Sequence, residues 1–78
     1  MRRQKALTHA FGGVIHGERK RAGMSQERLG LRAKIHPTYI SQLERGLKSP
    51  SLEVVAALAK ALGRKPHELI RAAEDAGK

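Results

Sequence analysis

The fold is decided by the stretch Ser25-Gln26-Glu27-Arg28-Leu29 … Tyr39-Ile40-Ser41-Gln42-Leu43-Glu44-Arg45-Gly46. Ser25 is a favourable N-cap for a short helix, because its side-chain oxygen can accept a hydrogen bond from the first turn. Pro37 suits the first position of a second helix, which we expect to run to about Arg45. Lys34-Ile35-His36 forms the turn between the two helices, and Gly46 ends the second one.

Apolar residues lie on the sides of these two helices that must meet. Two short helices joined by a tight turn pack against each other, and their facing residues are Leu29, Ala33, Ile35, Ile40 and Leu43. The pattern therefore predicts a helix-turn-helix over about residues 25–45, an arrangement in which the second helix can enter the major groove of DNA.

Three further helices are predicted from apolar residues that recur at spacings of three and four. Their stripes are Leu7, Ala10, Phe11, Val14 and Ile15 before the helix-turn-helix; Leu52, Val55, Ala56, Ala59 and Leu62 between the cap Ser51 and the stop Gly63; and Leu69, Ile70 and Ala73 after Pro66. No segment alternates as a strand does. The expected fold class is a compact all-α bundle of five helices.

One domain is expected over residues 7–74. We expect residues 1–6 to form a flexible basic arm, or an arm that follows the DNA backbone or a narrow minor groove, and residues 75–78 to be a frayed tail. A chain of 78 residues without cysteine has a small core and no disulfide or thiolate metal site. Self-association is therefore the expected additional source of stability.

The charge is concentrated in the first two thirds of the chain. Residues 1–48 carry eleven basic and three acidic side chains, a net charge of +8, whereas residues 49–78 carry five basic and four acidic ones. Such a concentration is typical of a protein that binds a polyanion. The sequence has no apolar run of the length that spans a membrane and no secretory signal. We expect a cytoplasmic protein that associates with the nucleoid when it binds DNA.

The second helix of the pair has a polar side suited to a DNA groove. At 100° per residue, Ile40 and Leu43 face the core, and the opposite side carries Thr38, Ser41, Gln42 and Arg45. Hydroxyl and amide groups can hydrogen-bond to base edges, and arginine to bases or phosphate. Gln26, at the start of the preceding helix, is placed to contact a phosphate, and His36 is interpreted as a turn residue near phosphate. The alternative is an ordinary solvated helix face.

These residues resemble the Cro/C1-type (xenobiotic-response-element type) helix-turn-helix regulators of phage and bacteria. The resemblance covers residues 11–70 and rests on Arg19, Gly23-Met24-Ser25-Gln26, Leu29, His36-Pro37-Thr38-Tyr39-Ile40-Ser41-Gln42-Leu43-Glu44-Arg45-Gly46, Ser49-Pro50-Ser51-Leu52 and Leu58-Ala59-Lys60-Ala61-Leu62-Gly63. It implies a lambda-repressor-like DNA-binding fold.

The resemblance also implies a role for individual positions. The base-contacting positions are Pro37, Thr38, Ser41 and Gln42, with Tyr39 at their edge. The phosphate-contacting positions are Gln26, Arg45 and Lys48. Arg19 and Glu44 match a pair that forms a partly buried salt bridge between the first helix and the recognition helix.

Four residues depart from the family pattern. Gly30 replaces the usual alanine, and Lys34 replaces the usual turn glycine, which often has a positive φ. Glu18 stands at a customary apolar position of the first helix, so that helix is expected to be rotated or its core thinner. Lys65 replaces the small capping residue before Pro66. These departures affect the turn and the stability rather than the base-contacting positions.

No constellation of catalytic or metal-binding residues is present in the sequence. His9 and His16 are seven residues apart on one helix, which is too far for a shared metal, and His36 and His67 lack suitable partners. We therefore expect no enzymatic activity, no metal and no cofactor.

The sequence is compatible with three functions. The first is a sequence-specific regulator of transcription that binds double-stranded DNA as a homodimer, with Leu69 and Ile70 as candidate dimer contacts unless they close the monomer core. It is expected to be autoregulatory, like restriction–modification controllers or phage repressors. The second is an antitoxin that holds a toxin protein and represses its own operon. The third is nonspecific DNA or RNA binding, which the scarcity of aromatic residues disfavours.

Overall fold

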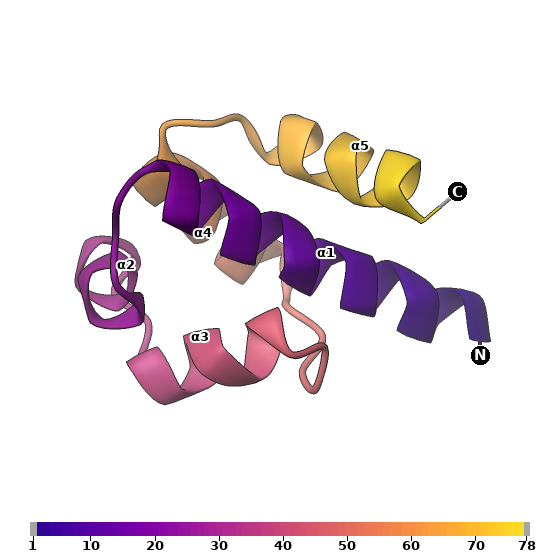
Figure 1. Ribbon diagram of the computed structural model, residues 1–78, viewed down its shortest axis with the longest axis horizontal. Helices are drawn as coiled ribbons and strands as arrows, with labels where there is room; N and C mark the ends of the chain where they lie inside the picture. The colour runs from indigo at the N-terminus through magenta and orange to yellow at the C-terminus, as the bar shows by residue number, and fades with distance from the viewer. Residues whose placement is uncertain (1, 78) are drawn as a thin grey trace.

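The computed structural model describes residues 2–77, with side chains from Ala6 onward. These residues form five α-helices: α1 (Arg2–Arg21), α2 (Gln26–Ala33), α3 (Pro37–Glu44), α4 (Leu52–Leu62) and α5 (Pro66–Ala76). The predicted all-α fold is confirmed. In Figure 1, α1 and α5 run side by side in opposite directions, α4 lies behind α1, and α2 and α3 form the lower part of the molecule.

The core takes side chains from all five helices. Six large side chains are almost fully buried: Ile15, Leu29, Ile40, Leu43, Leu58 and Leu69. The apolar faces predicted for the two helices of the helix-turn-helix, α2 and α3, are therefore packed in the core as expected. Because α2 and α3 are only eight residues each, this packing, rather than helix propensity, stabilises them.

Three residues predicted to be buried are exposed. Leu52 is 82% exposed and Ala56 is also exposed, because α4 turns Val55, Leu58 and Ala59 toward the core instead. Leu52 is the first residue of α4, at the edge of the packed region. Leu7 is 42% exposed, since the N-terminal turns of α1 project past α3 and α4 (Figure 1). The predicted stripes were wrong at these positions.

The two ends of the chain are more helical than predicted. Residues 2–6, expected to be a flexible arm, belong to α1, because Arg, Gln, Lys and Ala are good helix formers and no helix breaker precedes Gly12. Similarly, α5 continues through Asp75 and Ala76, which were assigned to a frayed tail. Met1 and Lys78 lie outside the described residues, as do the side chains of residues 2–5 on which the arm's DNA contact would depend.

The predicted caps are present. The Ser25 hydroxyl accepts a hydrogen bond from the Arg28 amide (3.0 Å), and the Ser51 hydroxyl accepts one from the Val54 amide (3.1 Å). These bonds satisfy backbone donors at the starts of α2 and α4.

The turn between α2 and α3 keeps the left-handed geometry that a glycine would normally supply. Lys34 has φ 60° and ψ 44°, which costs about 1 kcal/mol for a residue with a Cβ atom. The Ile35 amide then donates to the Gly30 carbonyl (2.9 Å). A Cβ atom at Gly30 would overlap the Ile35 carbonyl oxygen, so this glycine permits the close approach of the turn to α2.

Glu18 does not rotate α1 out of the core, since Phe11 and Ile15 remain buried. Instead, its carboxylate pairs with Arg64 in the loop before α5 (Nη1 to Oε1, 3.2 Å). Lys65 provides no side-chain cap for α5; in its place, Glu68 accepts a hydrogen bond from the Lys65 amide (2.8 Å), which holds the pKa of Glu68 below its ordinary value.

None of the helices within residues 2–77 has the length and hydrophobicity needed to cross a membrane.

Candidate nucleic-acid interface

The polar side of α3 forms one outer face of the molecule. Ile40 and Leu43 are completely buried, which turns the other side of the helix outward. The residues on or beside that side are exposed or half-buried: Thr38, Tyr39, Ser41, Gln42 and Arg45. The helix lies at the lower edge of the view in Figure 1, with no other helix below it. This face is therefore open to a macromolecule of the size of a DNA duplex.

His36 is the N-cap of α3. Its Nδ1 atom accepts a hydrogen bond from the Thr38 amide (3.0 Å), and Pro37 occupies the first helical position. Because Nδ1 is an acceptor, the neutral imidazole carries its hydrogen on Nε2. His36 is exposed, so this N–H can be donated to an acceptor outside the protein.

Gln26 connects the start of α2 to the end of α3. Its Nε2 atom donates to Oε1 of Glu44 (3.1 Å), and the side chain is half-buried. One amide hydrogen is used in this bond and the second remains available. The phosphate contact expected of Gln26 did not include this hydrogen bond to Glu44, which holds the Gln26 side chain in place within the protein.

Arg19 and Glu44 form the predicted salt bridge. Arg19 donates from Nε to Oε2 (2.6 Å) and from Nη2 to Oε1 (3.0 Å), and its Nη1 donates to the Met24 carbonyl (2.8 Å). The two side chains are only 8% and 4% exposed. A bidentate pair of this kind restricts both distance and orientation, so it fixes α3 against α1.

The same cluster shifts the pKa values of both partners. Burial acts to raise the pKa of Glu44, but hydrogen bonds from Arg19, His16 and Gln26 more than offset it, and the pKa lies below its ordinary value of 4.5. The hydrogen bond to Glu44 raises the pKa of Arg19. Both groups are therefore charged at neutral pH. Within the described residues, no buried side-chain nitrogen or oxygen lacks a hydrogen-bond partner.

Gly12 brings α1 close to the end of α3, and sequence analysis missed this role. A Cβ atom at this position would overlap the Leu43 carbonyl oxygen and crowd that of Glu44. The sequence showed Gly12 only as a weak point in a helix. Its one usable signal is its place beside Phe11, on the buried side of α1.

Arg45 and Lys48 lie just beyond α3 and are exposed. Arg45 is the C-cap residue, and its Nε atom donates to the Ser41 carbonyl at 3.4 Å. The structure thus brings Gln26, Ser41, Glu44 and Arg45 together around one hollow, while His36 lies at the opposite end of α3.

The family model described as helix-turn-helix (HTH_3) matches residues 15–69, a span that contains α2, α3 and the Arg19–Glu44 pair. The chain belongs to the helix-turn-helix (HTH_3) family. It is a DNA-binding transcriptional regulator, and the resemblance to Cro/C1-type regulators is confirmed.

Relatives of this helix-turn-helix regulator include restriction–modification controllers. It is 42% identical over 61 residues to control protein C.BamHI of Bacillus amyloliquefaciens. The aligned residues make up 77% of this chain and 75% of that protein. The restriction–modification controller C.AhdI of Aeromonas hydrophila superimposes with a TM-score of 0.78 at 34% identity, over 80% of this chain and 94% of that one. The clp gene regulator ClgR of Corynebacterium glutamicum superimposes with a TM-score of 0.87 at 30% sequence identity. The superposition covers 91% of this chain and 76% of that one.

Of the two roles expected for Leu69, a dimer contact or a place in the monomer core, the structure shows the second. Leu69 is 1% exposed and closes the core of the protomer, so its side chain is not available to a partner. Ile70 is half-buried and packs against the same core. Among the side chains that the structure describes, the large apolar ones that remain exposed are Leu7, Leu31, Leu47 and Leu52.

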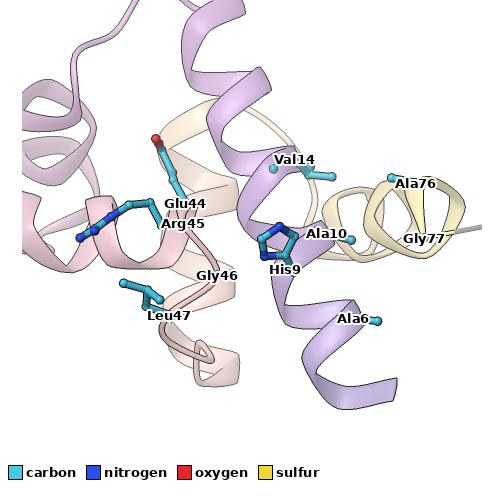
Figure 2. Close-up of a pocket in the computed structure, with 11 residues that line it drawn as sticks. Ala6, His9, Ala10, Val14, Glu44, Arg45, Gly46, Leu47, Ala76 and Gly77 are labelled. Atoms are coloured by element: carbon cyan, nitrogen blue, oxygen red, sulfur yellow. The ribbon is translucent and has the colours of Figure 1, made fainter. Parts of the chain in front are cut away.

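An apolar groove of about 990 Å³ lies beside the loop that follows α3. Figure 2 shows it between α1, the C-terminal end of α5 and this loop, with His9 next to Gly46. A Cβ atom at Gly46 would overlap the His9 ring. The remaining lining is mostly small or apolar and includes Ala6, Ala10, Val14, Leu47 and Ala76.

Proposed function

We propose that this regulator binds a palindromic double-stranded operator as a homodimer and inserts α3 into the major groove. In this arrangement Pro37, Thr38, Tyr39, Ser41 and Gln42 face the bases. The contacts to the DNA backbone come from Gln26, His36, Arg45 and Lys48.

The observation that carries this proposal is the combination of an open polar face and a rigid support. The exposed side of α3 carries hydroxyl, amide and guanidinium groups, which match the donors and acceptors of the major groove. Its buried side and its C-terminal end are fixed by Leu43 and by the Arg19–Glu44 pair. A reading helix held in this way loses little conformational freedom when it binds.

A dimer is supported by the size of the reading face. One short helix contacts only a few base pairs, whereas two copies about 34 Å apart on one face of the duplex read a full palindrome. We place the contact between copies at the apolar groove, at Leu47 in the loop between α3 and α4, and at Leu52, the first residue of α4.

The distribution of charged side chains favours this position for the contact between the two copies. The chain has a net charge of +9, so two copies can approach only where cations are few. Among the side chains described from Ala6 to Gly77, one exposed cation lines the groove, Arg45, and Figure 2 shows its side chain directed away from α1. Leu47 lines the groove, and Leu52 adds exposed apolar area at the start of α4.

The similarity to two controllers supports a role as a controller, which we propose to include control of the regulator's own expression. C.BamHI is a control protein and C.AhdI a restriction–modification controller, and this chain matches most of the length of each. A regulator of this size can respond to its own concentration through dimerisation. These names favour a controller over the antitoxin considered from the sequence.

The experiment that tests the proposal is selection of bound sequences from a pool of random duplexes. We expect a palindromic consensus whose half-sites are centred about one helical turn, or a multiple of it, apart. Enrichment without any consensus would show that binding is nonspecific, and an asymmetric consensus would contradict the homodimer.

A further inference from the structure

A hollow on the proposed DNA-binding side contains one titratable residue that has no assigned role. The hollow has a volume of about 440 Å³ and is lined by Gly13, His16, Gln26, Ser41, Glu44 and Arg45. Gln26, Ser41 and Arg45 are proposed DNA contacts. His16 comes from α1, outside the helix-turn-helix, and its side chain is 53% exposed.

The position of His16 determines which of its nitrogen atoms carries hydrogen. Nδ1 lies 3.0 Å from Oε1 of Glu44 and 3.3 Å from Nη2 of Arg19. The carboxylate can only accept, so the shorter contact requires a hydrogen on Nδ1. Arg19 Nη2 has a better acceptor in the same carboxylate oxygen, at 3.0 Å. In the neutral ring, Nε2 therefore has a lone pair and no hydrogen.

The surroundings of the hollow suit a phosphate diester. The carboxylate of Glu44 is 4% exposed and is already paired with Arg19, which reduces its repulsion of an approaching anion. Arg45 is exposed at the rim, and Gln26 has one uncommitted amide hydrogen. The charged groups that face the imidazole are Arg19 on its own helix, Glu44 at the end of α3 and Arg45 just beyond it.

We propose that His16 is a phosphate ligand of the bound DNA, and that it acts as an imidazolium bridging Glu44 and one backbone phosphate. This inference rests on the proposed placement of DNA against α3. A phosphate diester has no hydrogen to donate, so Nε2 must take up a proton from solvent before it can donate a hydrogen bond to the phosphate oxygen. Nδ1 meanwhile keeps its hydrogen bond to Glu44. DNA binding is thereby coupled to the uptake of up to one proton by each protomer.

The test compares the affinity of wild type and His16→Gln for the selected operator between pH 6 and pH 8.5 at constant salt. Glutamine can still donate to Glu44 but cannot be protonated. We expect the wild-type Kd per protomer to rise by up to about tenfold per pH unit as the pH increases across this range, and the rise to be largely absent in His16→Gln. His67→Gln, at an exposed position of α5, is the matched control and should behave as wild type.

One further measurement shows whether the pH effect of His16 depends on a phosphate of the operator. Replacing single phosphates of the operator by uncharged methylphosphonates should abolish the His16-dependent pH effect at one position in each half-site. If no position does so, the protonation acts on the protein alone and the proposal is overturned. An unchanged pH dependence in His16→Gln would overturn it as well. Failure of wild type to bind any selected duplex at any pH would instead refute the proposed function.

Discussion

The amide of Gln26 donates a 3.1 Å hydrogen bond to the carboxylate of Glu44, which connects the first residue of α2 to the last residue of α3. Arg19 of α1 holds the same carboxylate through two further hydrogen bonds. One buried acidic group therefore positions three helices. Its contacts fix both the reading helix and the side chain that we assign to the neighbouring phosphate.

Replacing Arg19 by Met should destabilise the fold by about 3–5 kcal/mol, because it leaves the Glu44 carboxylate buried without its partner. Urea denaturation measures this loss. Arg71→Met, at an exposed position of α5, is the control and should lie within about 0.5 kcal/mol of wild type. The double variant Arg19→Met/Glu44→Met should recover much of the loss, since no charge is then unpaired. Equal stability of Arg19→Met and the control would contradict the role of the pair.

Acid should weaken the fold through Glu44. Its pKa is below 4.5 in the folded protein, so the ionised carboxylate contributes stability that is fully present above 4.5 and is lost as the pH falls through the folded-state pKa. An NMR titration of the side-chain carboxyl group measures that pKa directly, and urea denaturation at decreasing pH should show the parallel loss. A titration midpoint at or above 4.5 would refute this expectation.

The sequence predicted the helix-turn-helix well because its signals are local. Ser25, Pro37 and Gly46 mark helix ends through backbone chemistry, and Ile40 and Leu43 follow directly from helical spacing. The Arg19–Glu44 pair was reached by resemblance, since the two residues are 25 positions apart and no local pattern relates them.

The remaining features depend on how helices meet in space. The burial of Leu58 and the exposure of Leu52 follow from the orientation of α4 in the core. The apolar residues of α4 are compatible with more than one buried face, so their spacing alone does not determine that orientation. Likewise, His16 reaches Glu44 only because α1 crosses the end of α3. The pairing of Glu18 with Arg64 also joins segments far apart in the chain. The spacing of residues along the sequence does not indicate contacts between such distant segments.

Gln42 and Lys48 should have different effects on DNA binding. Gln42→Ala should cost about 1–3 kcal/mol at the cognate operator and relax the choice of one base pair in each half-site. Lys48→Ala should weaken binding to all duplexes about equally and reduce the salt slope by about one. Fluorescence anisotropy on single-base operator variants at several salt concentrations distinguishes the two. A base-selective loss in Lys48→Ala would contradict its assignment to phosphate.

Leu47 and Leu52 should be required for the dimer. They are 61% and 82% exposed, so replacing both by Ser removes apolar area from the proposed contact without opening the core. Sedimentation at micromolar concentration should show a dimer for wild type and a monomer for the double variant. Leu31→Ser, at a 75% exposed position of α2, is the control and should remain dimeric. A wild type that is monomeric both free and on DNA would exclude the homodimer.

Two neighbouring glycines of α1 should respond to alanine in opposite directions. A methyl group at Gly12 would overlap the Leu43 carbonyl oxygen. Separating α1 from α3 to make room should cost about 1–3 kcal/mol, which exceeds the gain of about 1 kcal/mol in helix propensity. Gly13 is exposed, and its added methyl group would meet nothing within 4 Å, so Gly13→Ala should stabilise the protein by up to about 1 kcal/mol. Urea denaturation of the two variants gives the comparison. If Gly12→Ala were as stable as Gly13→Ala, α1 and α3 would not be in the close contact that positions the end of the reading helix.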